Sequence, residues 1–91
     1  MHTSSHVFTI LNDKGLHARA SARFVEVVEK FASEVIVEKD GLEASGGSIM
    51  GLLMLAASKG TSIKVTLNGS DAEELVLALE ELINSKFGEE S

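Results

Sequence analysis

The residues most able to do chemistry lie in the stretch GLHARASARF, where Arg19 follows His17 by two positions. A strand pattern gives way to a helix pattern here, so the spacing predicts His17 at the start of a helix. The unpaired N–H groups and partial positive charge of a helix N-terminus disfavour an imidazolium. A histidine there stays neutral near pH 7 and keeps a nucleophilic ring nitrogen. If that nitrogen takes a phosphoryl group, the helix amides and the Arg19 guanidinium can bind the new oxygens.

The same spacing has a plainer interpretation, in which His17 only caps the helix and Arg19 is a solvated side chain. A lone His-x-Arg pattern does not separate the two, and on spacing alone the plainer interpretation has the advantage. Two residues just before His17 favour the other interpretation, in which the histidine is held in place for a partner protein. Gly15 permits a close approach of the chain or a partner, and Leu16 can anchor the turn in the core. Phosphoryl transfer depends mainly on positioning and charge stabilisation, which such a site supplies.

A second constellation, SGGSIMGLLML, places Ser48 after two glycines and before an apolar helix. The Ser48 hydroxyl is a natural N-cap, and the phosphate-binding pattern G-x-x-x-x-G-K-[ST] is absent. The helix is apolar nearly all round, whereas a helix on one sheet buries a single stripe. Unless flanking helices bury it, one arc must therefore face water or a partner. The first candidate arc is Leu52, Leu55 and Ala56, and the second is Ile49, Met50 and Leu53, with Met54 and Ala57 nearby.

The bulk composition limits the class of protein. The 91 residues suffice for one small domain, 1–91, with 1–5 and 88–91 expected to fray. The net charge of −6 argues against nucleic acid as a partner, and the absence of cysteine excludes disulfides and thiol nucleophiles. No apolar run is long enough to span a membrane and no secretory signal is present, so we expect a soluble cytoplasmic protein.

The remaining ionisable residues suggest no second site. His2 and His6 are four residues apart but have no third ligand indicated by the sequence, so we expect no metal. No dinucleotide fingerprint is present, and no cofactor is expected. We interpret Glu89 and Glu90 as solvated charges near the end of the chain.

The elements that must position these residues follow from hydrophobic periodicity and turn signals. The first is a strand over 6–11, followed by a helix over 18–32. A hairpin over 33–45 turns at Asp40-Gly41, and a short helix over 49–58 is ended by Gly60. A strand over 61–67 precedes a last helix capped by Ser70 or Asp71. This β-α-β-β-α-β-α order predicts an α+β fold, a largely antiparallel four-stranded sheet with the helices on one face.

Three stretches, GLHARASARF, SIMGLLMLAASKG and GSDAEEL, resemble the histidine-containing phosphocarrier family, HPr, of the phosphoenolpyruvate-dependent phosphotransferase system. The resemblance covers residues 6–88 and implies an open-faced β-sandwich. It implies that His17 accepts a phosphoryl group on Nδ1 from phosphorylated enzyme I and passes it to an enzyme IIA domain. Arg19 is then its charge partner. The resemblance also implies which arc docks both partners: Ile49, Met50 and Leu53.

The resemblance has one further implication, for Ser48, and this sequence departs from the family pattern at two positions. Ser48 matches a regulatory serine that a dedicated serine kinase phosphorylates in some bacteria, but Gly47 stands where a lysine is usual, which weakens recognition by a kinase. Ala20 stands where the family usually has proline. Alanine is a good helix former, so replacing proline costs the helix little stability. With alanine at this position, the stretch looks more like the nitrogen-type branch of the family.

The sequence therefore predicts a monomeric phosphocarrier that is a protein substrate with no turnover of its own. Its partners would be enzyme I and an enzyme IIA domain, in sugar uptake or in nitrogen-type regulation. The alternative is a regulatory protein-binding module that uses the Ile49, Met50 and Leu53 face while His17 stays silent. A small ligand-binding domain is a weaker rival, since the sequence gives no sign of a concave apolar pocket.

Overall fold

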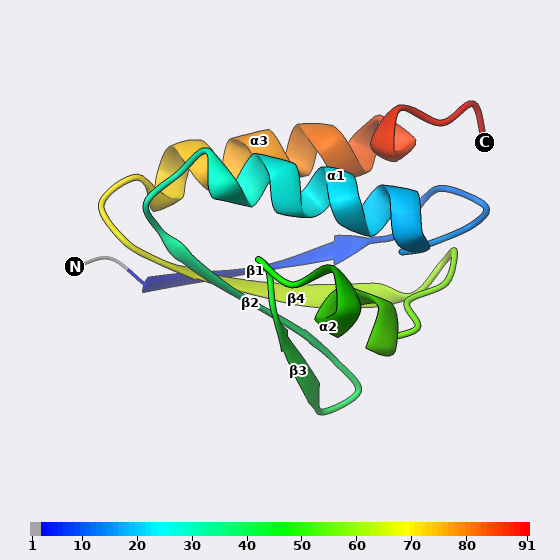
Figure 1. Cartoon of the computed structure of the whole chain (residues 1–91), viewed down its shortest axis with the longest axis horizontal. Helices are drawn as coiled ribbons and strands as arrows, with labels where there is room; N and C mark the ends of the chain where they lie inside the picture. Colours follow the sequence, from blue (N-terminus) through cyan, green and yellow to red (C-terminus); the bar gives the residue numbers. More distant parts are fainter. Residues whose placement is uncertain (1–2) are drawn as a thin grey trace.

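The computed structural model describes residues 3–91, which form one sheet with helices packed over one of its faces (Figure 1). The elements in chain order are β1 (Thr3–Thr9), α1 (Ala18–Glu29), β2 (Glu34–Lys39), β3 (Leu42–Ser45), α2 (Ile49–Met54), β4 (Ser62–Asn68), α3 (Ala72–Asn84) and a 3-10 turn, η1 (Lys86–Gly88). The sheet order is β1-β4-β2-β3, and every neighbouring pair is antiparallel. The predicted α+β open-faced sandwich is confirmed.

Buried and exposed residues alternate along the central strands, which explains why the helices cover only one face of the sheet. In β4, Ile63, Val65 and Leu67 are buried, whereas Ser62 and Lys64, which alternate with them, are exposed. Because successive side chains of a strand point to opposite faces, the buried set meets the helices and the other set meets water. The fully buried core combines these strand residues with large apolar side chains from the loops and helices: Ile10, Phe24, Leu52, Leu75, Leu79, Ile83 and Phe87.

The three helices divide the covered face between them. Helix α1 contacts α3 on one side and α2 on the other, α3 also lies against β1, and α2 lies against β3 (Figure 1). The start of α1, the end of α2 and the C-terminal tail consequently gather at one end of the molecule. This is the end that carries His17.

Several element boundaries differ from the prediction. Strand β1 begins at Thr3, so residues 3–5, which were expected to fray, instead pair with β4, with Ser4 opposite Leu67. Residues 1–2, including His2, lie outside the described part of the chain. Helix α2 ends at Met54 rather than near 58, because Ala56 takes a left-handed backbone conformation with φ of +51°. The predicted Asp40-Gly41 hairpin turn is confirmed.

The predicted role of Asp71 is also corrected. Asp71 stands at the N-cap position of α3, but within residues 3–91 its side chain makes no capping hydrogen bond to that helix. Its carboxylate instead accepts hydrogen bonds from the backbone amides of Ala32 and Ser33, at 2.8 and 3.0 Å, and from the Ser33 hydroxyl. Asp71 therefore joins the start of α3 to the loop between α1 and β2, which lie close only in the folded chain.

Candidate functional site

His17 is the N-cap residue of α1, and a tight turn presents it. The turn closes with a hydrogen bond from the Gly15 amide to the carbonyl of Asn12, and Gly15 has φ of +62°, which glycine adopts without strain. Leu16 is buried, and its amide donates to the carbonyl of Ala57 at 2.9 Å. Both predicted functions of the neighbours are confirmed: Gly15 allows a close approach and Leu16 anchors the turn.

The His17 side chain does not cap the helix. Within residues 3–91 it forms no capping hydrogen bond, although its backbone carbonyl accepts from the Ser21 amide in the usual helical way. The ring instead turns toward the tail, where Nε2 pairs with the carboxylate of Glu89. The side chain keeps 27% of its surface exposed. The plainer interpretation of His17 as a polar cap is therefore wrong.

Glu89 is one of the site residues that sequence reasoning missed, with Asn12 and Lys14. It was interpreted as a solvated charge, yet only 15% of its side chain is exposed. The tail reaches His17 because Lys86, Phe87 and Gly88 all have positive φ, so the chain reverses after α3. Phe87 is fully buried and holds this turn to the core. The sequence did contain a signal for this, Phe87 beside Gly88 near the chain end. A large apolar side chain there favours burial against the core and argues against a frayed tail.

Asn12 holds the other oxygen of Glu89. Its amide nitrogen donates to Glu89 Oε1 at 3.0 Å and to the carbonyl of Gly15 at 2.8 Å, and the residue is fully buried. Burial alone would raise the pKa of Glu89. The hydrogen bonds from His17 and Asn12, together with electrostatic attraction to the His17 ring and to Lys14, outweigh it and lower the pKa of Glu89 below its usual value. Glu89 is thus a carboxylate that can only accept hydrogen bonds.

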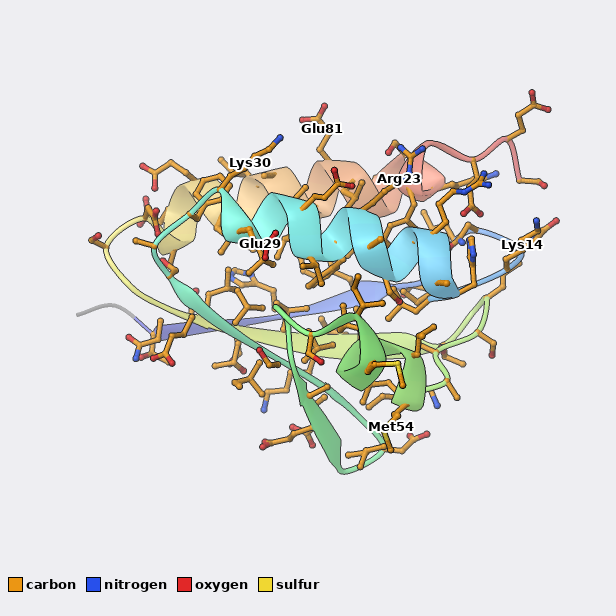
Figure 2. The ribbon with its side chains drawn as sticks, viewed as in Figure 1. Lys14, Arg23, Glu29, Lys30, Met54 and Glu81 are labelled. Atoms are coloured by element: carbon orange, nitrogen blue, oxygen red, sulfur yellow. The ribbon has the colours of Figure 1, made fainter. Side chains whose placement is uncertain are left out.

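Two cations border the histidine, one of which was predicted. A surface pocket is lined by His17, Glu89, Lys14 and Arg19, together with Asp13, Glu90 and Ser91. Arg19 lies in the first turn of α1 and is exposed, and Lys14 is exposed in the preceding turn, at the end of the molecule seen on the right of Figure 2. The structure therefore brings Arg19 and His17 to one pocket, as the spacing indicated, and adds Lys14. Lys14, Arg19 and the amides of the helix start can bind an anion, while the carboxylates of Asp13, Glu89 and Glu90 in the same lining offset part of this positive charge.

The second predicted constellation lies beside the first. A hollow next to His17 is lined by Leu53, Ala56 and Ala57, so the end of α2 forms one wall of the histidine site. Farther out on α2, Met50 is 68% exposed and Ile49 is also exposed. Met54, which the sequence places near this arc, is equally exposed (Figure 2). Leu52 and Leu55 are buried, so the outward arc is the one that contains Ile49, Met50 and Leu53.

Ser48 has the capping role that its position predicted. It is the N-cap of α2, and its Oγ accepts a hydrogen bond from the Gly51 amide at 3.0 Å. The side chain is half-buried rather than fully covered. Ser48 does not line either hollow beside His17.

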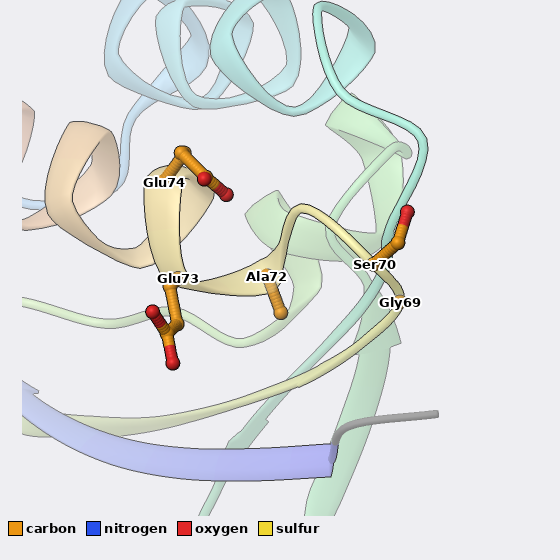
Figure 3. Close-up of a pocket in the computed structure, with 5 residues that line it drawn as sticks. All are labelled: Gly69, Ser70, Ala72, Glu73 and Glu74. Atoms are coloured by element: carbon orange, nitrogen blue, oxygen red, sulfur yellow. The ribbon is translucent and has the colours of Figure 1, made fainter.

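The remaining candidates form no site within residues 3–91. No group of three or more potential metal ligands is found there, and His6 lies within β1 with Nε2 near the Ser4 hydroxyl. A further hollow at the start of α3 is lined by Gly69, Ser70, Ala72, Glu73 and Glu74 (Figure 3). The carboxylates of Glu73 and Glu74 lie in the first turn of α3, where they interact favourably with the positive end of the helix dipole. In the described part of the chain, no helix is long and apolar enough to cross a membrane.

The fold and the histidine site together define a class of protein: a small open-faced sandwich with a partly exposed histidine at the start of its first helix. A family model described as "PTS HPr component phosphorylation site" matches residues 4–85. The chain therefore belongs to the HPr family of phosphocarrier proteins of the phosphotransferase system, as the sequence resemblance indicated.

Individual relatives agree with this assignment. The phosphocarrier protein HPr of Neisseria meningitidis serogroup A is 51% identical over 80 residues, covering 88% of this chain and 90% of that protein. The phosphocarrier protein NPr of Escherichia coli K12 is 37% identical over 89 residues, covering 97% of this chain and 99% of that protein. A crystal structure of HPr from Thermoanaerobacter tengcongensis superposes with a TM-score of 0.92 at 44% identity, covering 97% and 99% of the two chains.

Proposed function

We propose that His17 accepts a phosphoryl group from phosphorylated enzyme I and passes it to an enzyme IIA domain. One observation carries the proposal: the partly exposed His17 side chain lines both a pocket that contains the cations Lys14 and Arg19 and a hollow that contains Leu53 of α2. The cations and the helix amides can bind phosphoryl oxygens. The apolar surface can hold a donor or acceptor protein while the group moves.

The proposed reaction leaves this chain as a carrier rather than an enzyme with its own turnover. The lone pair on a ring nitrogen of His17 attacks phosphorus, and the bond from phosphorus to the donor breaks. The reverse attack by an acceptor restores the free histidine. The chain supplies position and charge, which dominate phosphoryl transfer. We propose Arg19 as the charge partner, because it lines the same pocket and its planar fork can bind two phosphoryl oxygens.

The docking face in this proposal consists of Ile49, Met50 and Leu53. Its support is the exposure of Ile49 and Met50 together with the position of Leu53 in the hollow beside His17. Methionine adapts to differently shaped apolar partners, as a carrier with a donor and an acceptor requires. The proposal covers both sugar uptake and nitrogen-type regulation, since relatives with both names match the chain and the HPr relative from Neisseria is the more identical.

The decisive test is incubation with phosphoenolpyruvate and the cognate enzyme I. We expect one acid-labile phosphate per chain, absent in His17→Ala and retained in His6→Ala, which changes a histidine of β1 that lines neither hollow at His17. Labelling that persists in His17→Ala, or no labelling of the wild type, would contradict the proposal. If a partner assay depends on Met50 but not on His17, the chain is instead a protein-binding module.

We also propose Ser48 as a regulatory phosphorylation site. Its half-buried hydroxyl lies at the start of α2, next to Ile49 in the chain. A phosphate there would place a dianion beside the apolar docking face and hinder docking. Treatment with a serine kinase specific for this family, followed by mass spectrometry of wild type and Ser48→Ala, tests this. No phosphate at Ser48 would contradict it.

A further inference from the structure

The contact between His17 and Glu89 suggests a role for the C-terminal tail. Nothing in the GLHARASARF stretch requires a carboxylate at the histidine, and the two residues are 72 positions apart. The tail nevertheless brings Glu89 to Nε2, and it does so through a turn of three positive-φ residues around the buried Phe87. Such a backbone costs energy at non-glycine positions, so the core must hold it in place.

Both oxygens of Glu89 are engaged, which fixes the direction of the carboxylate. Oε2 faces His17 Nε2, and Oε1 accepts from the amide of Asn12 at 3.0 Å. Asn12 is itself immobilised, because it is fully buried and also donates to the carbonyl of Gly15. The tail, the turn before α1 and the histidine ring thus form one hydrogen-bonded unit.

The chemistry of the partners sets the protonation of the ring. A carboxylate can only accept a hydrogen bond, so His17 Nε2 must carry the hydrogen. In a neutral imidazole the other nitrogen, Nδ1, then holds the free lone pair. Within residues 3–91, the His17 side chain makes no capping hydrogen bond that would occupy that nitrogen.

We propose that Glu89 is a positioning residue that orients His17 with Nδ1 as the nucleophile and offsets the charge that the ring acquires on phosphorylation. This inference rests on the proposed phosphoryl transfer to His17. The Nδ1 lone pair forms the new bond to phosphorus, and the bond between phosphorus and the donor breaks with its electron pair going to the donor. The Nε2 proton stays in place, so the ring becomes cationic and faces the Glu89 carboxylate.

The experiment compares wild type with Glu89→Ala and Glu89→Gln, and uses Glu81→Gln as a control. Glu81 is exposed on α3 (Figure 2), and its substitution changes the net charge equally. The first readout is the Nε2–H resonance of His17 in a ¹⁵N-labelled protein. We expect a slowly exchanging resonance in wild type and Glu81→Gln that is lost in Glu89→Ala. Glu89→Gln has one acceptor oxygen for two donors, His17 Nε2–H and the Asn12 amide, so we expect a resonance that exchanges faster than in wild type but is not lost.

The second readout is the rate of phosphorylation by enzyme I. We expect Glu89→Ala to be slower by about tenfold, the range of a hydrogen bond to a charged group. Glu89→Gln should fall between Glu89→Ala and wild type, because it keeps an acceptor but loses the charge. A Glu89→Ala protein that keeps the resonance, or that is phosphorylated at or above the wild-type rate, would overturn the inference.

The two readouts separate this inference from the proposed function. If wild type is not phosphorylated at all, the proposed function fails, while the Nε2–H resonance still tests the contact. If wild type and Glu89→Ala are phosphorylated equally, only the role of Glu89 fails. Thermal unfolding of both Glu89 variants checks that the fold is intact, and Glu89→Gln, the closer substitute, still tests the contribution of charge if Glu89→Ala does not fold.

Discussion

Gly15 lies directly against the backbone of Ala57, so the turn that presents His17 is joined to the segment that follows α2. A Cβ built on Gly15 would overlap the Ala57 carbonyl oxygen and lie 2.9 Å from the Cα of Ser58. The next amide, that of Leu16, donates to the same carbonyl at 2.9 Å. The proposed phosphorylation site and the proposed docking helix are therefore fixed to each other by backbone contacts rather than by adaptable side chains.

The first prediction concerns this contact. Gly15→Ala should destabilise the protein by about 1–3 kcal/mol, because it combines a left-handed backbone at φ of +62° with a backbone overlap. It should also slow phosphorylation of His17, because the turn must shift relative to α2. Urea unfolding and the enzyme I assay measure the two effects.

The matched control is Gly60→Ala. Gly60 has φ of +88°, but a Cβ there meets open space. It should cost only about 1 kcal/mol and leave the transfer rate unchanged. Equal losses in the two variants would show that the approach to Ala57 is unimportant.

The second prediction concerns the docking face. Met50→Glu should slow phosphoryl transfer by about tenfold or more, because it places a charge on an apolar contact surface. Its stability should change by no more than about 0.5 kcal/mol, since the side chain is 68% exposed. Transfer kinetics and thermal unfolding provide the two measurements.

Leu77→Glu is the control, because Leu77 is 64% exposed on α3, an element that does not line either hollow at His17. It should transfer at the wild-type rate. By contrast, Leu52→Ala should lose about 2–5 kcal/mol, since Leu52 is fully buried on the other side of α2. A large stability loss in Met50→Glu would instead show that Met50 belongs to the core.

The third prediction concerns Ser48 as an N-cap. Ser48→Ala should lose about 1 kcal/mol, because the Gly51 amide loses its hydrogen-bond acceptor in a helix of only six residues. Ser70→Ala, at an exposed serine before α3, should be nearly neutral. Denaturant unfolding compares them, and equal stabilities would argue that the cap contributes little.

The fourth prediction concerns pH. The Ser33 hydroxyl and the Ala32 amide, with a further hydrogen bond from the Ser33 amide, lower the pKa of Asp71 despite the opposing effect of burial. The unfolded chain then binds a proton at higher pH than the folded one. The contribution of Asp71 to stability is therefore complete above about pH 3.8 and lost as the pH falls from there through the folded pKa.

Unfolding measured from pH 7 down to pH 2 tests this sign. Asp71→Asn should be less stable than wild type at pH 7, and the difference should shrink in acid. Ser33→Ala should show a weaker acid dependence than wild type, because it removes the largest contribution to the shift. A difference between Asp71→Asn and wild type that grows in acid would contradict the assignment.

The sequence by itself determined the elements and much of the site. Alternation in 62–68 and helical spacing in 18–29 are local properties, so the strands, the helices and the covered face could be predicted. The place of His17 at a helix start and the outward arc of α2 followed from the same patterns and from the family resemblance. His17 could be proposed as the phosphoryl acceptor because the motif around it is contiguous.

The tertiary structure alone decided which distant residues meet. Glu89 reaches His17 because a turn of positive-φ residues and the buried Phe87 reverse the chain, and no periodicity encodes that direction. Asp71 binds Ser33 rather than capping its own helix for the same reason: the loop that carries Ser33 is brought beside it by packing. Such contacts depend on where the core places separate segments, whereas sequence patterns report only on neighbours along the chain.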